Sequence, residues 1–119
     1  MSHIIELIPQ LLTDLKNIGI PVEEVDLFVR PYSKTFYGRY FPVYDENVIK
    51  PKIHLYPFSN TSGSLLSYST IFSTAVHEFC HHIQFSNKNY QRVKGVMHNP
   101  NFWEIYNSFI NKAENENIL

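Results

Sequence analysis

The residues with the clearest chemical meaning are two histidines and a glutamate in the run His77-Glu78-Phe79-Cys80-His81, an H-E-x-x-H pattern. In an α-helix at roughly 100° per residue, side chains four positions apart project side by side, so His77 and His81 can bind one metal ion. Glu78 points in a neighbouring direction and can reach a metal-bound water without being a ligand. The pattern therefore predicts a zinc-dependent hydrolase.

The residues around this pattern favour a helix that is buried along one side. Apolar side chains recur at helical spacing and form one stripe, while the two histidines lie on the opposite side; the stripe consists of Phe72, Ala75, Val76, Phe79, Cys80 and Ile83. If the two histidines were ordinary surface residues, the charged Glu78 beside them would have no role in packing this mostly apolar helix. A buried metal-binding helix explains both features.

A catalytic zinc site takes a third protein ligand, and His98 is the candidate we favour. Asn99 is a good N-cap and Pro100 suits the first position of a helix, so His98 would lie at the start of a new helix. One apolar face then repeats along that helix, formed by Phe102, Tyr106, Phe109, Ile110 and Ala113. This face would hold His98 over the histidine pair.

Glu104 is the competing third ligand, because a large class of related zinc enzymes takes a glutamate from a downstream helix. Glu104 lies 23 residues after His81, a spacing that permits both side chains to bind one ion. However, Glu104 is expected away from the apolar face of its helix, where a carboxylate is usually solvated. His82 is rotated about 100° from His81 and cannot easily join the same ion.

The two segments together resemble the zinc site of SprT-like (Spartan-type) metallopeptidases. The resemblance rests on His77-Glu78-Phe79-Cys80-His81 and His98-Asn99-Pro100-Asn101-Phe102-Trp103, and it covers mainly residues 70 to 106. It implies a zincin domain with three histidine ligands, Glu78 as the base and a protein or peptide substrate. Asn99 departs from the pattern, since a glycine commonly follows the third histidine in the nearest families.

The rest of the chain predicts an α+β fold. An apolar helical face ends at Gly19, and it comprises Ile4, Ile5, Ile8, Leu11, Leu12, Leu15 and Ile18. Three β-rich runs follow at residues 25–29, 36–41 and 52–56. We expect a minimal zincin-like domain with an N-terminal helix, a three-stranded, largely antiparallel sheet, the metal-binding helix and a C-terminal helix. The resemblance suggests residues 53–56 as the edge strand that pairs with substrate.

Length and composition favour one small enzyme domain over residues 1–119. Residues 113–119, in which Glu and Asn alternate, are expected to fray. No apolar run is long enough to span a bilayer and no signal peptide is recognisable, so we expect a cytoplasmic protein without a membrane partner. The single cysteine, Cys80, excludes an internal disulfide and a zinc ribbon.

The charge pattern gives little support to nucleic acid as a partner, because the net charge is −1. The local exception is a basic cluster of Lys88, Arg92 and Lys94. Two other functions stay open: a non-catalytic zinc-binding module that holds a partner protein, and a DNA-associated protease that acts on protein adducts. The oligomeric state is not indicated by these residues.

Overall fold

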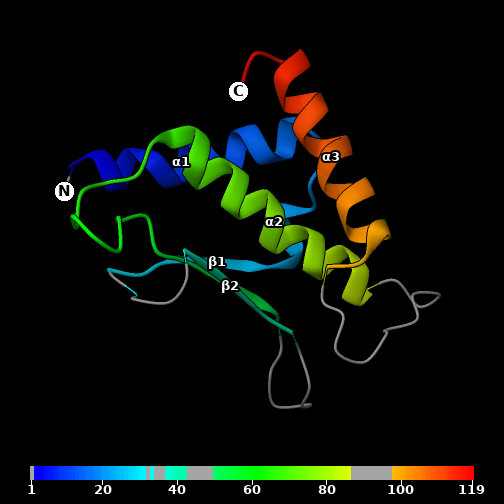
Figure 1. The fold of residues 1–119 in the computed structure, drawn as a ribbon, viewed down its shortest axis with the longest axis horizontal. Coiled ribbons are helices and arrows are strands. Elements are labelled where there is room, and N and C mark those ends of the chain that lie inside the picture. Colours follow the sequence, from blue (N-terminus) through cyan, green and yellow to red (C-terminus); the bar gives the residue numbers. More distant parts are fainter. Residues whose placement is uncertain (1, 32, 34–36, 43–49, 87–97) are drawn as a thin grey trace.

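The computed structural model describes residues 2–31, 33, 37–42, 50–86 and 98–119, with the side chains of residues 2–6 left out. Three α-helices and three strands form two layers, with all helices on one side of the sheet (Figure 1). The elements are α1 (Ser2–Asn17), the short 3₁₀ helix η1 (Val22–Glu24), β1 (Asp26–Val29), β2 (Gly38–Phe41), β3 (Lys52–Leu55), α2 (Tyr68–Ser86) and α3 (Pro100–Asn115). The predicted α+β class is confirmed.

The sheet is mixed and not largely antiparallel as expected. Its strand order is β1-β3-β2, and β3 pairs in parallel with β1 and antiparallel with β2. Ile53 in β3 lies between Leu27 of β1 and Tyr40 of β2. The chain thus passes from one edge of the sheet to the other before it returns through the middle. Local strand signals give no information about this order.

The expectation that residues 53–56 form an edge strand is wrong, because β3 is hydrogen-bonded on both sides. Its residues Ile53, His54 and Leu55 are all buried. Among the described strands, β2 is the edge that packs along α2. The edge strand next to α2 is therefore the second in the chain and not the third.

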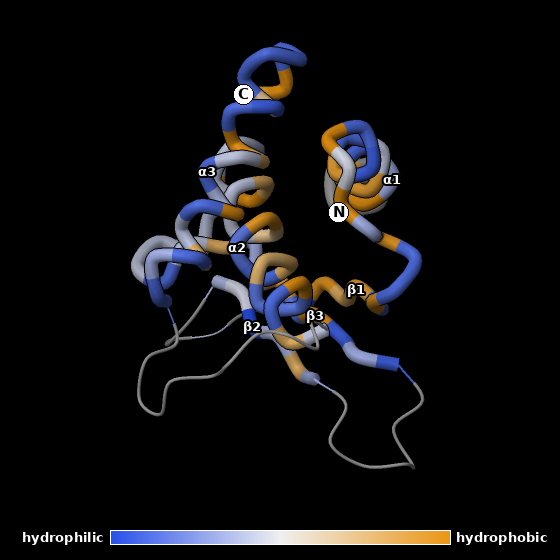
Figure 2. The backbone as a smooth tube through the Cα atoms, turned by 90° about the vertical axis from the view of Figure 1, so that its right-hand side faces the viewer, coloured by the Kyte–Doolittle hydropathy of each residue, from blue (hydrophilic) through white to orange (hydrophobic). Residues whose placement is uncertain are grey.

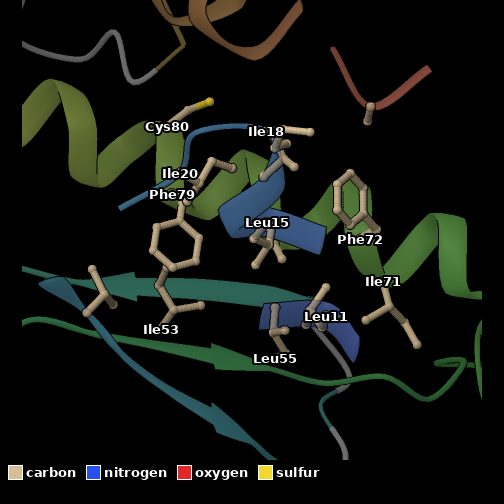
Figure 3. Close-up of a cluster of buried hydrophobic side chains, with 14 of the residues drawn as sticks. Leu11, Leu15, Ile18, Ile20, Ile53, Leu55, Ile71, Phe72, Phe79 and Cys80 are labelled. Carbon is tan, nitrogen blue, oxygen red and sulfur yellow. The ribbon is translucent and has the colours of Figure 1, made fainter. Parts of the chain in front are cut away.

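The core lies between α1, α2 and the helix-facing side of the sheet. Leu11 and Leu15 from α1 meet Phe72 and Phe79 from α2, and Phe79 points toward Ile53 of β3 (Figure 3). Hydrophobic segments of the helices and strands face this interior (Figure 2). Full burial of a leucine or phenylalanine side chain contributes about 1.5 to 3 kcal/mol to the free energy of folding, relative to leaving it exposed. One face of α2 is therefore firmly held, which leaves the opposite face for the histidines.

Backbone turns follow the last residues of α1 and of α3. Helix α1 includes Pro9 without a break and ends at Asn17, and the turn that follows contains Gly19, whose φ of 92° belongs to the left-handed region that favours glycine. At the other end α3 continues to Asn115, and the amide of Ile118 donates to the carbonyl of Ala113 at 2.8 Å.

This C-terminal arrangement differs from the frayed tail expected for residues 113–119. Ala113 is fully buried and Ile118 packs against the core, so apolar contacts hold a segment whose composition suggested disorder. None of the described helices has the length and apolar character that a membrane-spanning segment needs.

Candidate metal centre

Helix α2 presents His77 and His81 side by side, as the helical spacing predicted. The centroids of the two imidazole rings are 5.1 Å apart. Both side chains are partly exposed, whereas their neighbours Val76, Phe79 and Cys80 are fully buried on the other side of the helix. The core packing of α2 thus fixes the direction of the histidine pair.

His98 joins this pair from the start of α3. Asn99 is the N-cap, and its side-chain oxygen accepts a hydrogen bond from the backbone amide of Phe102 at 2.9 Å. Pro100 occupies the first turn, so both predicted start signals are confirmed. The cap places Nε2 of His98 3.2 Å from Nε2 of His81.

The three histidines could hold a metal ion. One potential ligand atom from each of His77, His81 and His98 lies within 4.8 Å of the other two. Glu104 is exposed on α3 and does not belong to this group. Between the two candidates for the third ligand, the geometry therefore favours His98.

The surroundings of His98 favour its neutral imidazole over the protonated form. Burial lowers the pKa of His98, the nearby His77 lowers this pKa further, and the Glu78 carboxylate opposes the shift. A metal ligand must be the neutral imidazole, so a lowered pKa leaves more of the side chain ready to bind near neutral pH.

Glu78 is the buried acid of the site. Its side chain is nearly inaccessible, and Oε2 lies 2.9 Å from Nδ1 of His77. Glu78 and His77 line the same cavity of about 500 Å³, together with Tyr106 of α3. The carboxylate therefore contacts a candidate ligand and also lines this cavity.

Gly38 at the start of β2 is a site residue that the sequence reasoning missed. A Cβ atom at this position would lie 2.7 Å from Cγ2 of Thr74 and 2.9 Å from Cγ of Glu78. Only glycine lets the strand approach the helix this closely. The sequence signal was a lone glycine within a strand pattern, which often marks a close backbone approach.

Phe102 lies beneath all three histidines. Its ring centroid is 5.0 Å from that of His77, 4.7 Å from His81 and 4.8 Å from His98. The side chain is fully buried, whereas that of Trp103 is 42% exposed. Phe102 is thus the common floor of the histidine cluster, in line with its expected position on the apolar face of α3.

A second missed feature is a buried amide that joins the two helices. Nε2 of Gln84 in α2 donates to Oδ1 of Asn99 at 3.1 Å and to Oδ1 of Asn101 at 2.9 Å. Gln84 is buried, whereas Asn99 is partly buried and Asn101 is exposed, so these hydrogen bonds are partly shielded from water. The N-cap that positions His98 is therefore itself held by α2. Sequence spacing gave no reason to pair these residues.

His82 and Cys80 belong to other parts of the structure. The ring nitrogens of His82 contact the hydroxyl of Tyr40 at 2.8 Å and a carboxylate oxygen of Glu24 at 2.9 Å, so His82 lies outside the group of three histidines, as expected. Burial, with a further contribution from Glu78, raises the pKa of the Cys80 thiol to about 12. Cys80 is therefore an unreactive core residue.

Comparison with family models, with curated proteins and with solved structures found no match to this chain. The function must therefore be inferred from the residues themselves. The basic cluster of Lys88, Arg92 and Lys94 lies outside the described residues.

Proposed function

We propose that this chain is a zinc-dependent peptidase that uses His77, His81 and His98 as ligands and Glu78 as the base. The observation that carries the proposal is the convergence of three imidazoles from two helices beside a buried carboxylate. The same residues carry the resemblance to SprT-like metallopeptidases.

The donor set fits zinc. Three imidazoles with a fourth position left open form a common catalytic zinc environment, whereas magnesium and calcium prefer oxygen ligands. In a tetrahedral site with Zn–N distances near 2.0 to 2.1 Å, two ligand nitrogens are about 3.4 Å apart. The 3.2 Å between His81 and His98 is close to this value. The widest separation in the cluster, within 4.8 Å, requires a small inward rotation of a side chain.

Zinc held by these ligands would lower the pKa of a coordinated water toward about 7 and polarise the scissile carbonyl. Glu78 takes the proton of the attacking water and delivers it to the leaving amine. The contact between Glu78 and Nδ1 of His77 leaves Nε2 of His77 for the metal. The cavity lined by Glu78 and His77 supplies the space for the peptide.

Strand β2 takes over the substrate-pairing role that was expected of residues 53–56. Among the described strands it is the edge nearest to Glu78, since Gly38 approaches that side chain. An extended peptide could add to such an edge through main-chain hydrogen bonds.

The test measures metal and catalysis on the same preparations. We expect about one zinc per chain, with strong loss of zinc after His77→Ala, His81→Ala or His98→Ala and full retention after Glu104→Ala as the control. Glu78→Gln should retain zinc and lose peptide cleavage by roughly 10²-fold or more. Retention of zinc by His98→Ala, with loss in Glu104→Ala, would assign the third ligand to the glutamate.

Wild-type protein that binds zinc and cleaves no member of a broad peptide library would instead support the non-catalytic binding module. The DNA-associated protease predicts salt-dependent binding to single- or double-stranded DNA, which a titration at several salt concentrations detects. The cytoplasmic location stays a prediction from the sequence.

A further inference from the structure

The side of the sheet that is turned away from the helices carries a row of aromatic rings. The described helices α1, α2 and α3 all lie on the opposite side, so none of them covers this surface (Figure 1). The ring centroid of His54 in β3 is 5.6 Å from that of Phe28 in β1 and 4.7 Å from that of Phe41 in β2. The ring of Tyr56 lies 6.5 Å from that of His54. These four rings form a continuous aromatic surface across the three strands, which we call the outer face.

Positive charge gathers on the same face. Lys52 lies opposite Phe41 in the register of β2 and β3, and Arg39 lies opposite His54. The guanidinium carbon of Arg39 is 4.9 Å from the ring centroid of Phe41, and Nζ of Lys52 is 5.8 Å from it. Burial lowers the pKa of His54, and the charge of Arg30 adds to this shift, so Arg30 is also near the aromatic row. Three cations therefore surround the rings.

This positive charge is hidden in the net charge of the whole chain, which is −1. Among the described residues, the acid that strand alternation places on the outer face is Asp26, and Nζ of Lys50 pairs with its carboxylate at 3.2 Å. The three cations are exposed, and Phe28 is 44% exposed. An approaching ligand therefore meets both an excess of positive charge and an accessible ring.

We propose that the outer face binds a single strand of nucleic acid. Unpaired bases stack on aromatic rings and on guanidinium planes, and the phosphates that join the bases pair with nearby cations. The outer face offers both kinds of group within one surface. A duplex keeps its base faces inside, so only a single strand can use the rings. Base faces and phosphates are common to DNA and RNA.

Two other kinds of partner match the outer face less well. Insertion into a membrane requires apolar side chains that project freely, whereas Phe41 is partly buried and has Arg39 and Lys52 close to its ring. His54 is only 9% exposed. An acidic protein segment would pair with the cations but would leave the rings unused. A single strand of nucleic acid uses both.

The test measures binding of a labelled oligothymidylate of about 12 nucleotides by fluorescence anisotropy at several salt concentrations. Phe28→Ala should weaken binding about 5-fold or more, because a base loses its ring. It should not change the slope of log affinity against log salt, since no charge is removed. Phe85→Ala is the matched control: Phe85 is 41% exposed, lies on α2 and should leave binding unchanged when replaced.

The contribution of the phosphates is tested by a change of charge. Lys52→Gln should weaken binding and reduce the salt slope by about 0.7, the value expected for one phosphate contact with a single strand. Lys16→Gln on α1, where the side chain is 70% exposed, is the matched control and should leave the slope unchanged. Circular dichroism checks that each variant is folded.

An oligomer of the same length that lacks its bases separates stacking from simple attraction between charges. We expect the wild-type protein to bind this abasic chain at least 5-fold more weakly than oligothymidylate. Equal affinity for the two, or affinity that Phe28→Ala leaves unchanged, would overturn the proposal. Oligouridylate tests RNA in the same way, and this pattern with either oligomer supports the proposal.

Two further outcomes would also decide against the outer face. Binding to vesicles of anionic lipid without binding to either oligonucleotide would assign the surface to a membrane. Absence of any binding at low salt would leave the face without the partner proposed. Neither result bears on the proposed peptidase, because these measurements require neither zinc nor cleavage. Loss of zinc or of cleavage in the tests given above would likewise leave this proposal standing.

Discussion

At the scale of single residues, Glu78 would have two roles under the proposed function, and substitution by alanine alone cannot separate them. Its carboxylate contacts Nδ1 of His77 at 2.9 Å and also lines the cavity. As a partner of a metal ligand it would orient the imidazole, and as a base it would move a proton. Only the second role needs a carboxylate, because an amide oxygen can also accept the hydrogen bond from His77.

Two substitutions at this position should therefore differ in metal affinity. Glu78→Gln should bind zinc about as tightly as wild type, whereas Glu78→Ala should lose roughly 10- to 100-fold in affinity, since His77 loses its orienting partner. Competition with a zinc chelator measures both. Equal affinity of the alanine and glutamine variants would show that Glu78 does not position His77.

His54 should make stability depend on pH. It is 9% exposed, and its ring centroid lies 4.7 Å from that of Phe41. Burial lowers its pKa, and the same direction is reinforced by the positive charges of Arg30, Lys52 and Arg39. The unfolded chain, in which the pKa is about 6.5, therefore binds a proton more readily than the folded protein. The stabilising contribution of neutral His54 is complete above that pH and is lost as the pH falls below it.

The measurement is the free energy of unfolding of metal-free protein between pH 7.5 and 5, so that release of metal does not contribute. Wild type should lose stability toward pH 5, and His54→Phe should show a shallower loss. The slope of the unfolding free energy against pH is compared between the two proteins, because the substitution also changes packing and therefore the absolute stability. The same slope in both would mean that His54 has an ordinary pKa in the folded state.

At the scale of elements, the docking of α3 on α2 decides whether His98 is in place. Phe102 is fully buried against the three imidazoles, so Phe102→Ala should cost about 3 to 5 kcal/mol of stability. It should also weaken zinc binding, because His98 loses the surface that supports it. Trp103→Ala is the control on the same turn, and its 42% exposed side chain predicts a smaller effect on both quantities. Chelator competition measures the zinc affinity of both variants, and denaturant unfolding measures their stability. Unchanged zinc affinity in Phe102→Ala would show that Phe102 does not support His98.

The contact of β2 with α2 should be sensitive to one methyl group. Gly38→Ala introduces a Cβ that would lie 2.7 Å from Cγ2 of Thr74, so the strand must shift away from the helix. We expect a destabilisation of about 1 to 3 kcal/mol and a loss of peptide cleavage. Zinc content should be retained, since the three histidines lie outside this contact. Adding Thr74→Ser removes Cγ2 and should restore part of the stability; no rescue would mean that the contact with Cγ of Glu78, at 2.9 Å, dominates the clash.

At the scale of the whole molecule, the features that the sequence predicted are those encoded in short windows. The histidine pair, the N-cap at Asn99 and the apolar stripe of α2 each depend on residues within about three helical turns. The three strands were also located to within about two residues, because alternation and β-rich composition are local properties.

The features that were missed depend on residues far apart in the chain. The position of β3 between β1 and β2, the approach of Gly38 to Thr74 and the hydrogen bonds from Gln84 to Asn99 all join separate elements. The tail was mispredicted for the same reason, since its composition does not reveal the core contact of Ile118. Such contacts are determined by packing between distant parts of the chain, so no local sequence pattern predicts them.

The division of the three histidines between α2 and α3 has a consequence for the concentration of folded protein. An ion that binds both helices binds the native chain and not the unfolded one, so each tenfold rise in free zinc above the dissociation constant would add about 1.4 kcal/mol to stability by mass action. The supply of free zinc would then set how often α3 separates from α2. In a zinc-poor environment the protein would be degraded sooner, and its abundance would follow the metal even where its synthesis is constant.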